Sequence, residues 1–303
     1  MIILKVIGGL GNQMFQIAFA RMLALEFNEK IYLDRSVYRK YKIRSFSISN
    51  LNVGNSIGYI EDVNLSIIDK LYMKVSQEIY HVYQKIVKVL KRNDRIGKMP
   101  YELLSKRGLY YNFDVYYYDA LKNNNKIKSI YGYFQSEKYF EKHKSRIIED
   151  LKVKTLLTDR EQKLLNEIKS CNAVGISMRL GDDYVKSSLL NVCKEDFYYR
   201  GMDYIHNKNK DVVFYIFSDC VDRAKELFEF KYPVRYIEGF KDYESLRLLY
   251  SCQHFLISNS SFSWWGAYLA DNADKIVVAP SKWYTDSKEQ PDIYLDYMTL
   301  LDV

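Results

Sequence analysis

Polar side chains suited to binding a phosphorylated ligand follow three apolar runs in the second half of the 303-residue chain. Ser177, Arg179 and Asp182 follow the first run, and Ser218 and Asp219 follow the second. The third run is followed by Asn259, Ser260, Ser261, Phe262 and Ser263. Arginine offers phosphate oxygens a planar pair of N–H donors, and hydroxyls at a helix start add neutral donors. An aspartate can accept two N–H bonds from a guanine edge. We therefore expect a site for a phosphorylated ligand here.

Each of these groups also has a purely structural interpretation. Arg179 and Asp182 can form an ion pair within a turn. Ser260 or Ser261 can cap a helix N-terminus, which is compatible with ligand binding. Trp264 and Trp265 come just inside the predicted helix, so we expect them in the core. The sequence alone leaves the structural and ligand-binding alternatives open for the three polar groups.

A glycine-rich turn after the first apolar run, Ile2–Ile7, is a second candidate binding element. Its candidate binding residues are Gly8, Gly9, Gly11, Asn12 and Gln13. Because a helix is predicted over Met14–Phe27, the turn brings backbone N–H groups and a helix start to one point. A dinucleotide fingerprint would need a third glycine where Met14 stands, which argues against a nicotinamide enzyme. A tight turn that binds no ligand remains the alternative.

Strands and helices alternate through the second half, which indicates βαβ units and a parallel sheet covered on both faces. Strands are predicted over Ala173–Met178, Val212–Phe217, Val234–Ile237, Phe255–Ile257 and Lys275–Ala279. Helices are predicted over Glu195–His206, Val221–Phe230, Tyr243–Ser251 and Phe262–Leu269. Ligands of such sheets bind beyond the carboxyl ends of the strands, where the three polar groups lie. A domain boundary is expected near residue 155, within the charged stretch around Glu137–Leu165.

Most of the chain's formal charge of +7 lies in one segment, Lys70–Lys98. Its basic residues are Lys70, Lys74, Lys85, Lys88, Lys91, Arg92, Arg95 and Lys98, against Glu78 and Asp94. An apolar stripe with helical spacing runs through it, formed by Leu71, Val75, Ile79, Val82, Ile86 and Leu90. We favour a domain helix with this stripe in the core and its lysines in water. Docking of the helix on an anionic bilayer is the open alternative.

Composition excludes several other classes. A chain with 48% hydrophobic and 27% charged residues can form a real core, which argues against disorder. The N-terminus lacks the features of a signal peptide, and no apolar run approaches the roughly 20 residues of a spanning helix. We therefore expect an intracellular protein. Its four cysteines form no CxxC pair or Cys/His cluster, so we expect buried thiols and no metal site. The basic charge comes without a nucleic-acid recognition motif, so no nucleic-acid partner is expected.

Four motifs occur in order along the chain. The first, GGLGNQMFQ, spans Gly8–Gln16 and is followed by Ala18, and the aromatic stretch YGYFQSE spans Tyr131–Glu137. The third is Phe217–Asp219, and the fourth, ISNSSFSWWGAYL, spans Ile257–Leu269, with Pro280, Trp283 and Tyr284 after it. With these motifs the sequence resembles the bacterial-type glycosyltransferase family 11 α-1,2-fucosyltransferases over essentially the whole chain, and Phe217–Asp219 matches the second nucleotide motif of that family.

The resemblance implies an α/β, GT-B-like fold with two domains facing across a cleft. Residues 1–155 would form an N-terminal α/β domain with the glycine loop on the acceptor side. Residues 156–303 would form a doubly wound, Rossmann-like parallel sheet that binds GDP-fucose. The implied reaction is inverting transfer of L-fucose to the 2-hydroxyl of a terminal galactoside, with no cofactor and no metal.

The resemblance also implies residue roles. Arg179 would grip the β-phosphate of the donor, helped by the helix start at Ser260–Ser263, and Asp219 would help to hold the guanine. Asn12 would be the most useful side chain of a glycine loop that closes over the fucose and diphosphate. Asp182 is one candidate for the base that deprotonates the acceptor.

The central motif departs from the family pattern, His-x-Arg-Arg-Gly-Asp-Tyr. Ser177 replaces the histidine, Leu180 replaces the second arginine, and Asp183 is an additional residue before Tyr184. Ser177 would give the guanine a shorter and weaker contact than a histidine. The departure motivates two alternatives: a catalytically impaired homologue that binds a sugar nucleotide, and a fucosyltransferase of different linkage.

The expected partners follow from the implied reaction. They are GDP-fucose and a galactoside acceptor, expected to be a lipid-linked glycan of surface polysaccharide or O-antigen synthesis. We expect a cytoplasmic protein, with peripheral contact to an anionic inner membrane face as an open prediction.

Overall fold

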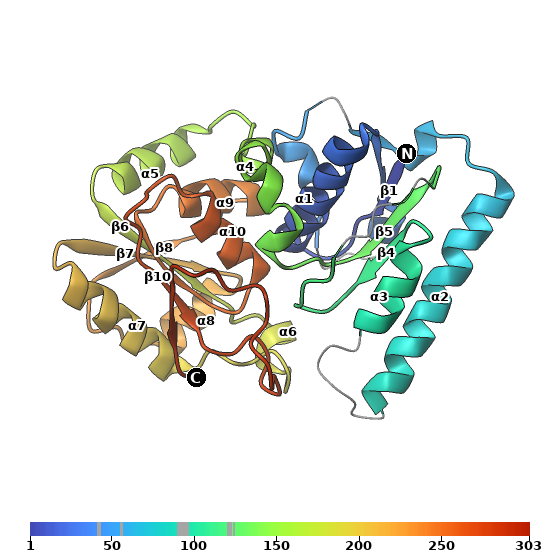
Figure 1. Ribbon diagram of the computed structural model, residues 1–303. Helices are drawn as coiled ribbons and strands as arrows, with labels where there is room; N and C mark the ends of the chain where they lie inside the picture. The colour runs from blue at the N-terminus through green and yellow to red at the C-terminus, as the bar shows by residue number, and fades with distance from the viewer. Residues whose placement is uncertain (41–43, 55–56, 90–96, 120–122, 124) are drawn as a thin grey trace. The chain divides into compact units, whose positions relative to one another are not determined.

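The computed structural model describes residues 1–40, 44–54, 57–89, 97–119, 123 and 125–303. The chain divides into two compact units, coloured along the sequence in Figure 1. Unit 1 comprises Met1–Leu151 and Pro291–Tyr294, and unit 2 comprises Lys152–Gln290 and Leu295–Val303. The division after Leu151 lies close to residue 155, whereas the return of Pro291–Tyr294 to unit 1 has no counterpart in the sequence analysis. Asp292 contributes to that return, since its Oδ2 accepts the Tyr117 N–H at 2.9 Å.

The described residues of unit 1 form a five-stranded parallel sheet in the order β3-β2-β1-β5-β4. Its strands are β1 (Ile2–Lys5), β2 (Ile31–Asp34), β3 (Ile57–Tyr59), β4 (Leu109–Asn112) and β5 (Lys128–Gly132). Its α-helices are α1 (Leu10–Phe27), α2 (Ile67–Val89), α3 (Lys98–Ser105) and α4 (Lys144–Leu151). Strands β3, β4 and β5 were not predicted, because they are short and follow no simple alternation.

Unit 2 is a six-stranded parallel sheet in the order β11-β10-β9-β6-β7-β8. Its strands are β6 (Asn172–Met178), β7 (Val212–Ser218), β8 (Val234–Ile237), β9 (His254–Ile257), β10 (Val277–Pro280) and β11 (Met298–Leu301). Its α-helices are α5 (Asp159–Lys169), α6 (Asp182–Val185), α7 (Glu195–Lys208), α8 (Val221–Leu227), α9 (Asp242–Tyr250) and α10 (Ser261–Leu269). The doubly wound parallel sheet predicted for this half is confirmed, with small shifts in bounds and with β11 added.

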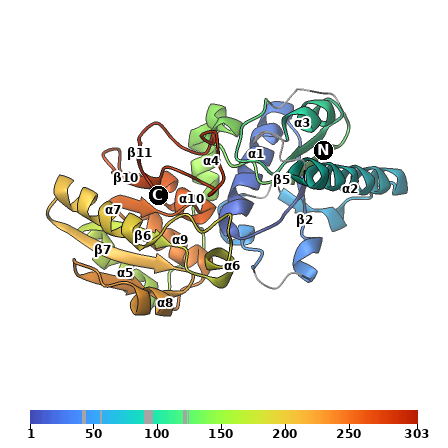
Figure 2. The same cartoon turned by 90° about the horizontal axis from the view of Figure 1, so that it is seen from below.

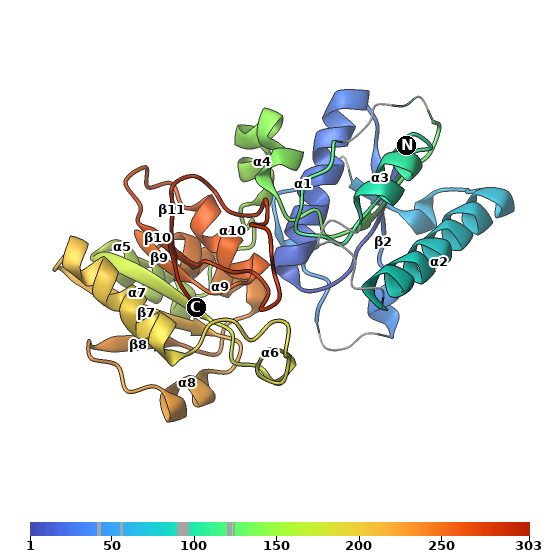
Figure 3. The ribbon, with the colours of Figure 1, turned by 60° about the horizontal axis from the view of Figure 1, so that its bottom comes forward.

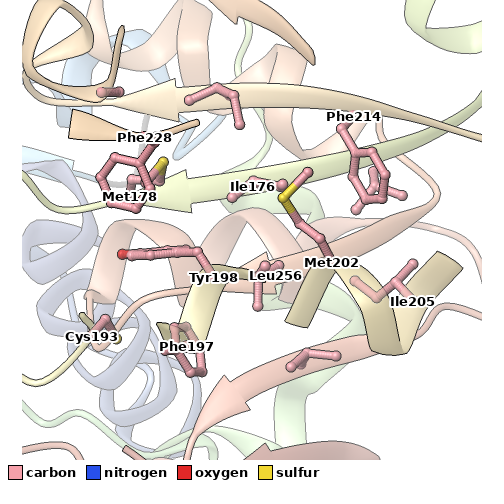
Figure 4. Close-up of a cluster of buried hydrophobic side chains, with 14 of the residues drawn as sticks. Ile176, Met178, Cys193, Phe197, Tyr198, Met202, Ile205, Phe214, Phe228 and Leu256 are labelled. Atoms are coloured by element: carbon pink, nitrogen blue, oxygen red, sulfur yellow. The ribbon is translucent and has the colours of Figure 1, made fainter. Parts of the chain in front are cut away.

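The core of unit 2 explains why these segments fold as predicted. Phe197, Met202 and Ile205 of α7 belong to one buried cluster with Ile176 of β6 and Phe214 of β7, drawn in Figure 4. All five side chains are buried. Burying side chains of this size contributes about 1.5–3 kcal/mol each, which stabilises α7 with its apolar face against the sheet. Trp264 and Trp265 are fully buried, as expected.

The apolar stripe of α2 is not in the core, so the interpretation favoured from the sequence is wrong. The exposed fractions of its described members range from 46% to 65% for Leu71, Val75, Ile79, Val82 and Ile86. Met73, Ser76 and Tyr80 form the buried face instead. Leu90, Lys91, Arg92, Asp94 and Arg95 lie outside the described residues, as do the side chains of Lys88 and Val89. Among the described helices, none combines the length and apolar character that a membrane crossing requires.

A buried ion pair joins two helices of unit 2. Arg247 on α9 contacts Glu161 on α5 through two hydrogen bonds, Nε to Oε1 at 2.6 Å and Nη2 to Oε2 at 3.0 Å. The Glu161 side chain is fully buried, and that of Arg247 is 10% exposed. Arg247 also donates to both oxygens of Thr155, which ties the start of unit 2 to the same pair.

We predict that Arg247→Ala lowers the free energy of unfolding by about 3–5 kcal/mol, because it leaves the Glu161 carboxylate buried and unpaired. Urea unfolding followed by circular dichroism measures the loss. Arg200→Ala is the matched control, since Arg200 pairs with Asp196 at a half-exposed position and should cost below about 1 kcal/mol. Equal losses of unfolding free energy in the two variants would contradict the conclusion that the Arg247–Glu161 pair is a buried, stabilising contact.

Candidate functional site

Three neighbouring strands of unit 2 bring the predicted polar groups to one edge of the sheet. Strand β6 lies between β9 and β7, and all three run parallel. Met178 is in register with Ser218, and Ser177 with Ile257. The turns after Met178, Ser218 and Ile257 therefore start side by side at the carboxyl end of the sheet, the region where such sheets bind ligands.

Asp219 organises the turn that follows β6. Its Oδ1 accepts two backbone hydrogen bonds, from Leu180 N at 2.8 Å and from Gly181 N at 3.0 Å. Gly181 lies so close that a Cβ there would stand 2.9 Å from Asp219 Oδ2. The carboxylate thus holds the turn in place, and each such charged hydrogen bond contributes about 1.5–3 kcal/mol. A contact between Asp219 and guanine remains a prediction.

Arg179 is held between two carboxylates. Its Nε lies 2.8 Å from Asp219 Oδ2, and its Nη2 donates to Asp183 Oδ2 at 2.8 Å. The side chain is 24% exposed, so the guanidinium is positioned by the turn and still reaches the surface. The structural ion pair foreseen between Arg179 and Asp182 therefore forms with Asp183 and Asp219 instead. Asp183 is the residue that the family pattern lacks.

Asp182 faces a different pair of cations. Its Oδ2 accepts from Lys186 Nζ at 2.7 Å, and its Oδ1 accepts from Arg223 Nη2 at 2.8 Å. Hydrogen bonds from Lys186 and then Arg223 lower the pKa of Asp182 to about 2. A carboxylate with such a low pKa is a weak proton acceptor at neutral pH. The geometry thus disfavours Asp182 as the base that the sequence analysis considered.

Charges at this edge of the sheet are balanced. Three cations, Arg179, Lys186 and Arg223, interleave with three carboxylates, Asp182, Asp183 and Asp219. A phosphate group that binds Arg179 on the side of one of its carboxylate partners would compete with that carboxylate. Asp183 is the partner that can move away, because its side chain is 50% exposed whereas that of Asp219 is 18% exposed.

Three buried hydroxyls link β6 to α10 behind the turn. Ser263 Oγ donates to Ser177 Oγ at 2.6 Å, and Ser258 Oγ lies 3.3 Å from Ser263 Oγ. The three residues are at most 5% exposed. Ser177 and Ser263 were predicted as binding residues, but their hydroxyls hold the sheet and helix together. The geometry does not support the expected contact between Ser177 and guanine.

Asn259 connects three loops. It accepts from Tyr184 Oη at 2.6 Å and donates to the carbonyls of Leu190 and Trp283 at 3.0 and 2.7 Å. Tyr184 in turn accepts the N–H of Cys193 at 3.0 Å. Both side chains are buried, and burial raises the pKa of the Tyr184 hydroxyl well above its ordinary value. Asn259 therefore positions the site rather than presenting its amide to solvent.

The start of α10 is the part of the third polar group that reaches the surface. Ser260 is the N-cap residue, but its side chain makes no capping hydrogen bond, so the predicted hydroxyl cap at Ser260 is not formed. Ser261 and Phe262 are half-buried in the first turn. A helix start directs backbone N–H groups outward and favours an anion. Ser218, another predicted binding residue, makes a hydrogen bond within its own turn, since its Oγ accepts the Cys220 N–H at 3.1 Å.

In unit 1, the glycine turn leads into α1 at Leu10, four residues before the predicted start. Gly8 has a φ of 78°, in the left-handed region that favours glycine. Its carbonyl accepts from Gln13 Nε2 at 3.0 Å and from Tyr38 Oη at 2.6 Å. Gln13 also bonds Ser45 O and Ser47 N, and it is fully buried. Gln13, a predicted binding residue, is therefore the structural brace of the turn.

Asn12 is the half-buried side chain that the turn presents. Its Oδ1 accepts from Gln135 Nε2 at 2.8 Å. Gln135 belongs to the YGYFQSE stretch, where Gly132 and Phe134 both have positive φ values, 149° and 54°. At Gly132 a Cβ would lie 1.9 Å from Asn112 O, so only glycine fits. The two sequence motifs of unit 1 thus meet at the Asn12–Gln135 hydrogen bond.

Several residues that build the site were missed in the sequence analysis. Lys186 lies four residues after Asp182, and Asp183 lies four after Arg179, a spacing that pairs opposite charges on a helix. This signal applies to Asp182 and Lys186, at the two ends of α6, but not to Arg179, which precedes that helix. Arg223, Tyr184 and Gln135 gave no such signal, because their partners are distant in sequence. Arg44, whose Cδ lies 3.4 Å from the Cβ position of Gly9, is a further side chain at the glycine turn.

Comparison with known proteins adds relatives of similar length. An Escherichia coli alpha-1,2-colitosyltransferase is 28% identical over 294 residues, which cover 93% of this chain and 92% of the relative. The Escherichia coli O-antigen biosynthesis glycosyltransferase WbnK is 27% identical over 312 residues, covering 93% and 94% of the two chains.

Solved structures are similar at the level of the fold. The NodZ alpha-1,6-fucosyltransferase soaked with GDP-fucose matches with a TM-score of 0.51 at 12% identity, covering 89% of this chain and 92% of that one. An Arabidopsis thaliana FUT1 mutant in complex with GDP matches with a TM-score of 0.52 at 11% identity, covering 94% and 72%. The α/β fold is thus GT-B-like, as predicted. The sequence pattern described as "Glycosyl transferase family 11" matches residues 1–298, so the chain belongs to glycosyl transferase family 11.

Proposed function

We propose that this glycosyltransferase transfers L-fucose from GDP-fucose, with inversion, to the 2-hydroxyl of a terminal galactoside during O-antigen or other surface polysaccharide synthesis. The observation that carries the proposal is Arg179, held by Asp219 at the carboxyl end of β6 in a member of family 11. The fold neighbours crystallised with GDP-fucose or GDP support a nucleotide-sugar donor. The relatives' O-antigen and α-1,2 descriptions support the acceptor context and the linkage.

Arg179 has the position and chemistry to neutralise a departing diphosphate. We assign it the β-phosphate, with the Asp183 carboxylate exchanged for a phosphate oxygen. The start of α10, at Ser260–Phe262, would add backbone donors to the same anion. Removing one preorganised donor of this kind typically lowers the rate by about 10²–10³-fold, so such donors could do the work that a metal ion does in other transferases. The transition state would have oxocarbenium-ion character at the fucose.

The acceptor hydroxyl loses its proton to a group that the geometry does not single out. Asp182 is a poor candidate because Lys186 and Arg223 hold its pKa at about 2. A weak base suffices if the diphosphate departs well ahead of attack, since the oxocarbenium-like carbon then acidifies the incoming hydroxyl.

In unit 1 we assign Asn12, oriented by Gln135, to the donor sugar and diphosphate.

Two other functions stay as alternatives, each with its own support. The similarity to an alpha-1,2-colitosyltransferase favours a different donor sugar with the same linkage. The pairing of Arg179 with Asp183 favours a homologue that binds the sugar nucleotide but transfers it poorly. We further propose a lipid-linked glycan as the acceptor and a cytoplasmic, peripheral location.

We predict that the purified protein releases GDP from GDP-fucose only when a β-galactoside is present, and that EDTA leaves the rate unchanged. Product linkage is read by NMR, and a colitose donor run in parallel separates the two donor sugars. Transfer of colitose alone would move the donor assignment to colitose. Binding of GDP-fucose without turnover on a panel of galactosides would favour the impaired homologue, and rate loss in EDTA would contradict the metal-free reaction.

We predict opposite effects on GDP affinity from two neighbouring substitutions. Arg179→Ala removes a charged phosphate contact and should weaken GDP binding by roughly tenfold or more. Asp183→Asn releases Arg179 from its exposed partner and should tighten GDP binding several-fold. Calorimetry measures both affinities.

The control for Asp183→Asn is Asp196→Asn, which breaks another ion pair of the same i,i+4 spacing, with Arg200. It should leave GDP affinity unchanged. Weaker GDP binding by Asp183→Asn, or unchanged GDP binding by Arg179→Ala, would contradict the proposal that Arg179 binds the phosphate.

A further inference from the structure

Helix α2 carries a wide apolar face that the rest of unit 1 leaves uncovered. We call this the α2 apolar face, and it comprises Ile67, Ile68, Leu71, Tyr72, Val75, Ile79, Val82 and Ile86. Their exposed fractions range from 46% to 84%. Eight such side chains amount to several hundred Å², which reaches or exceeds the roughly 300–600 Å² of the largest apolar patch on a typical monomer.

The contacts of the opposite side fix the orientation of α2. Ser76 Oγ lies 2.8 Å from Tyr111 Oη, and the Tyr80 ring packs against Tyr111 at 5.7 Å between ring centroids. Gln77 accepts from Lys5 Nζ at 2.7 Å, and His81 Nε2 lies 2.8 Å from Tyr131 Oη. These four contacts hold α2 against β1, β4 and β5, so the apolar face must point to the surroundings. Figures 2 and 3 show α2 along an edge of unit 1.

Lysines border the apolar face along one side. Lys74 and Lys85 precede Val75 and Ile86 by one position, which places them about 100° around the helix. Both are exposed, as is Lys70. In the sequence, α2 carries Lys70, Lys74, Lys85 and Lys88 against Asp69 and Glu78, and Glu78, one turn after Lys74, is also exposed. Long lysine side chains beside an apolar stripe can extend their ammonium groups to lipid headgroups while their stems stay on apolar surface.

We propose that the α2 apolar face docks on an anionic lipid bilayer, with the helix lying parallel to the membrane plane. Apolar side chains would enter the boundary between headgroups and acyl chains, and the lysines would meet anionic headgroups. The charge selects this occupant, because each basic residue near an anionic membrane surface is attracted to it. The proposal depends on neither the donor sugar nor the acceptor of the proposed reaction.

A second copy of the chain is the competing occupant. Ile68, Tyr72, Val75, Ile79, Val82 and Ile86 alternate spacings of four and three, as in a coiled-coil seam. Pairing two copies through this face, however, would bring together two helices that each carry four lysines against two acidic residues in the sequence, so an excess of like charge would meet. A bilayer with anionic lipid supplies the opposite charge, whereas a second copy repeats the same one. The observations therefore favour the bilayer.

Vesicle flotation of the full chain tests the proposal. We expect recovery with vesicles of phosphatidylcholine plus phosphatidylglycerol, and at least tenfold lower affinity for phosphatidylcholine alone. High salt should weaken the binding. The variant Ile79→Ser with Val82→Ser should reduce affinity for the mixed vesicles by about tenfold or more, and Lys74→Gln with Lys85→Gln should act in the same direction.

The matched control is Leu156→Ser with Leu157→Ser, which changes two exposed leucines of unit 2 and should leave flotation unchanged. Circular dichroism checks that every variant is folded. Equal recovery with both vesicle types, or flotation unchanged by the α2 substitutions, would overturn the proposal. A dimer in light scattering that Ile79→Ser with Val82→Ser converts to a monomer would also overturn it, because a second copy would then cover the face.

Discussion

The carboxylate of Asp219 is the contact on which the arrangement of unit 2 depends. It joins the end of β7 to the turn after β6 by accepting the N–H groups of Leu180 and Gly181, and its other oxygen faces Arg179. One side chain thus sets both the path of the turn and the direction of its only guanidinium. An arginine on a freely moving turn would lose side-chain entropy when it bound a phosphate. Here much of that ordering already exists in the folded chain.

The residues around this turn divide into those that build the site and those that can meet a ligand. Four motif residues are buried and hydrogen-bonded within their own unit: Ser177, Ser263, Asn259 and Gln13. Their role is to stabilise the structure around the site. Arg179 and the start of α10 remain at the surface in unit 2. A sequence motif mixes the two kinds of residue, because a buried hydroxyl that braces a helix is as necessary to the site as a guanidinium that touches phosphate. Asp183 adds a constraint of its own, since a phosphate that binds the same side of the Arg179 guanidinium would compete with it.

The sequence predicts the second half of the fold well because its strands are short apolar runs separated by amphipathic helices, a pattern that indicates a parallel sheet with helices on both faces. It fails in two places for physical reasons. Strands β3, β4 and β5 contain residues such as Gly58, Asn112 and Lys128 that break any apolar alternation, and Lys128 is buried through its ion pair with Glu29. For α2, periodicity reveals an apolar stripe but not what covers it. Tyr80 and Ser76, which face the sheet, have no more apolar character than the exposed isoleucines, so the pattern points to the wrong face.

The central claim is that the turn anchored by Asp219 receives the diphosphate of a nucleotide sugar. A crystal structure of the protein with GDP tests it most directly, through the position of the Arg179 guanidinium. The account predicts that Arg179 keeps its contact with Asp219 and exchanges the Asp183 carboxylate for a β-phosphate oxygen. A diphosphate bound elsewhere, with Arg179 still paired to Asp183, would contradict it.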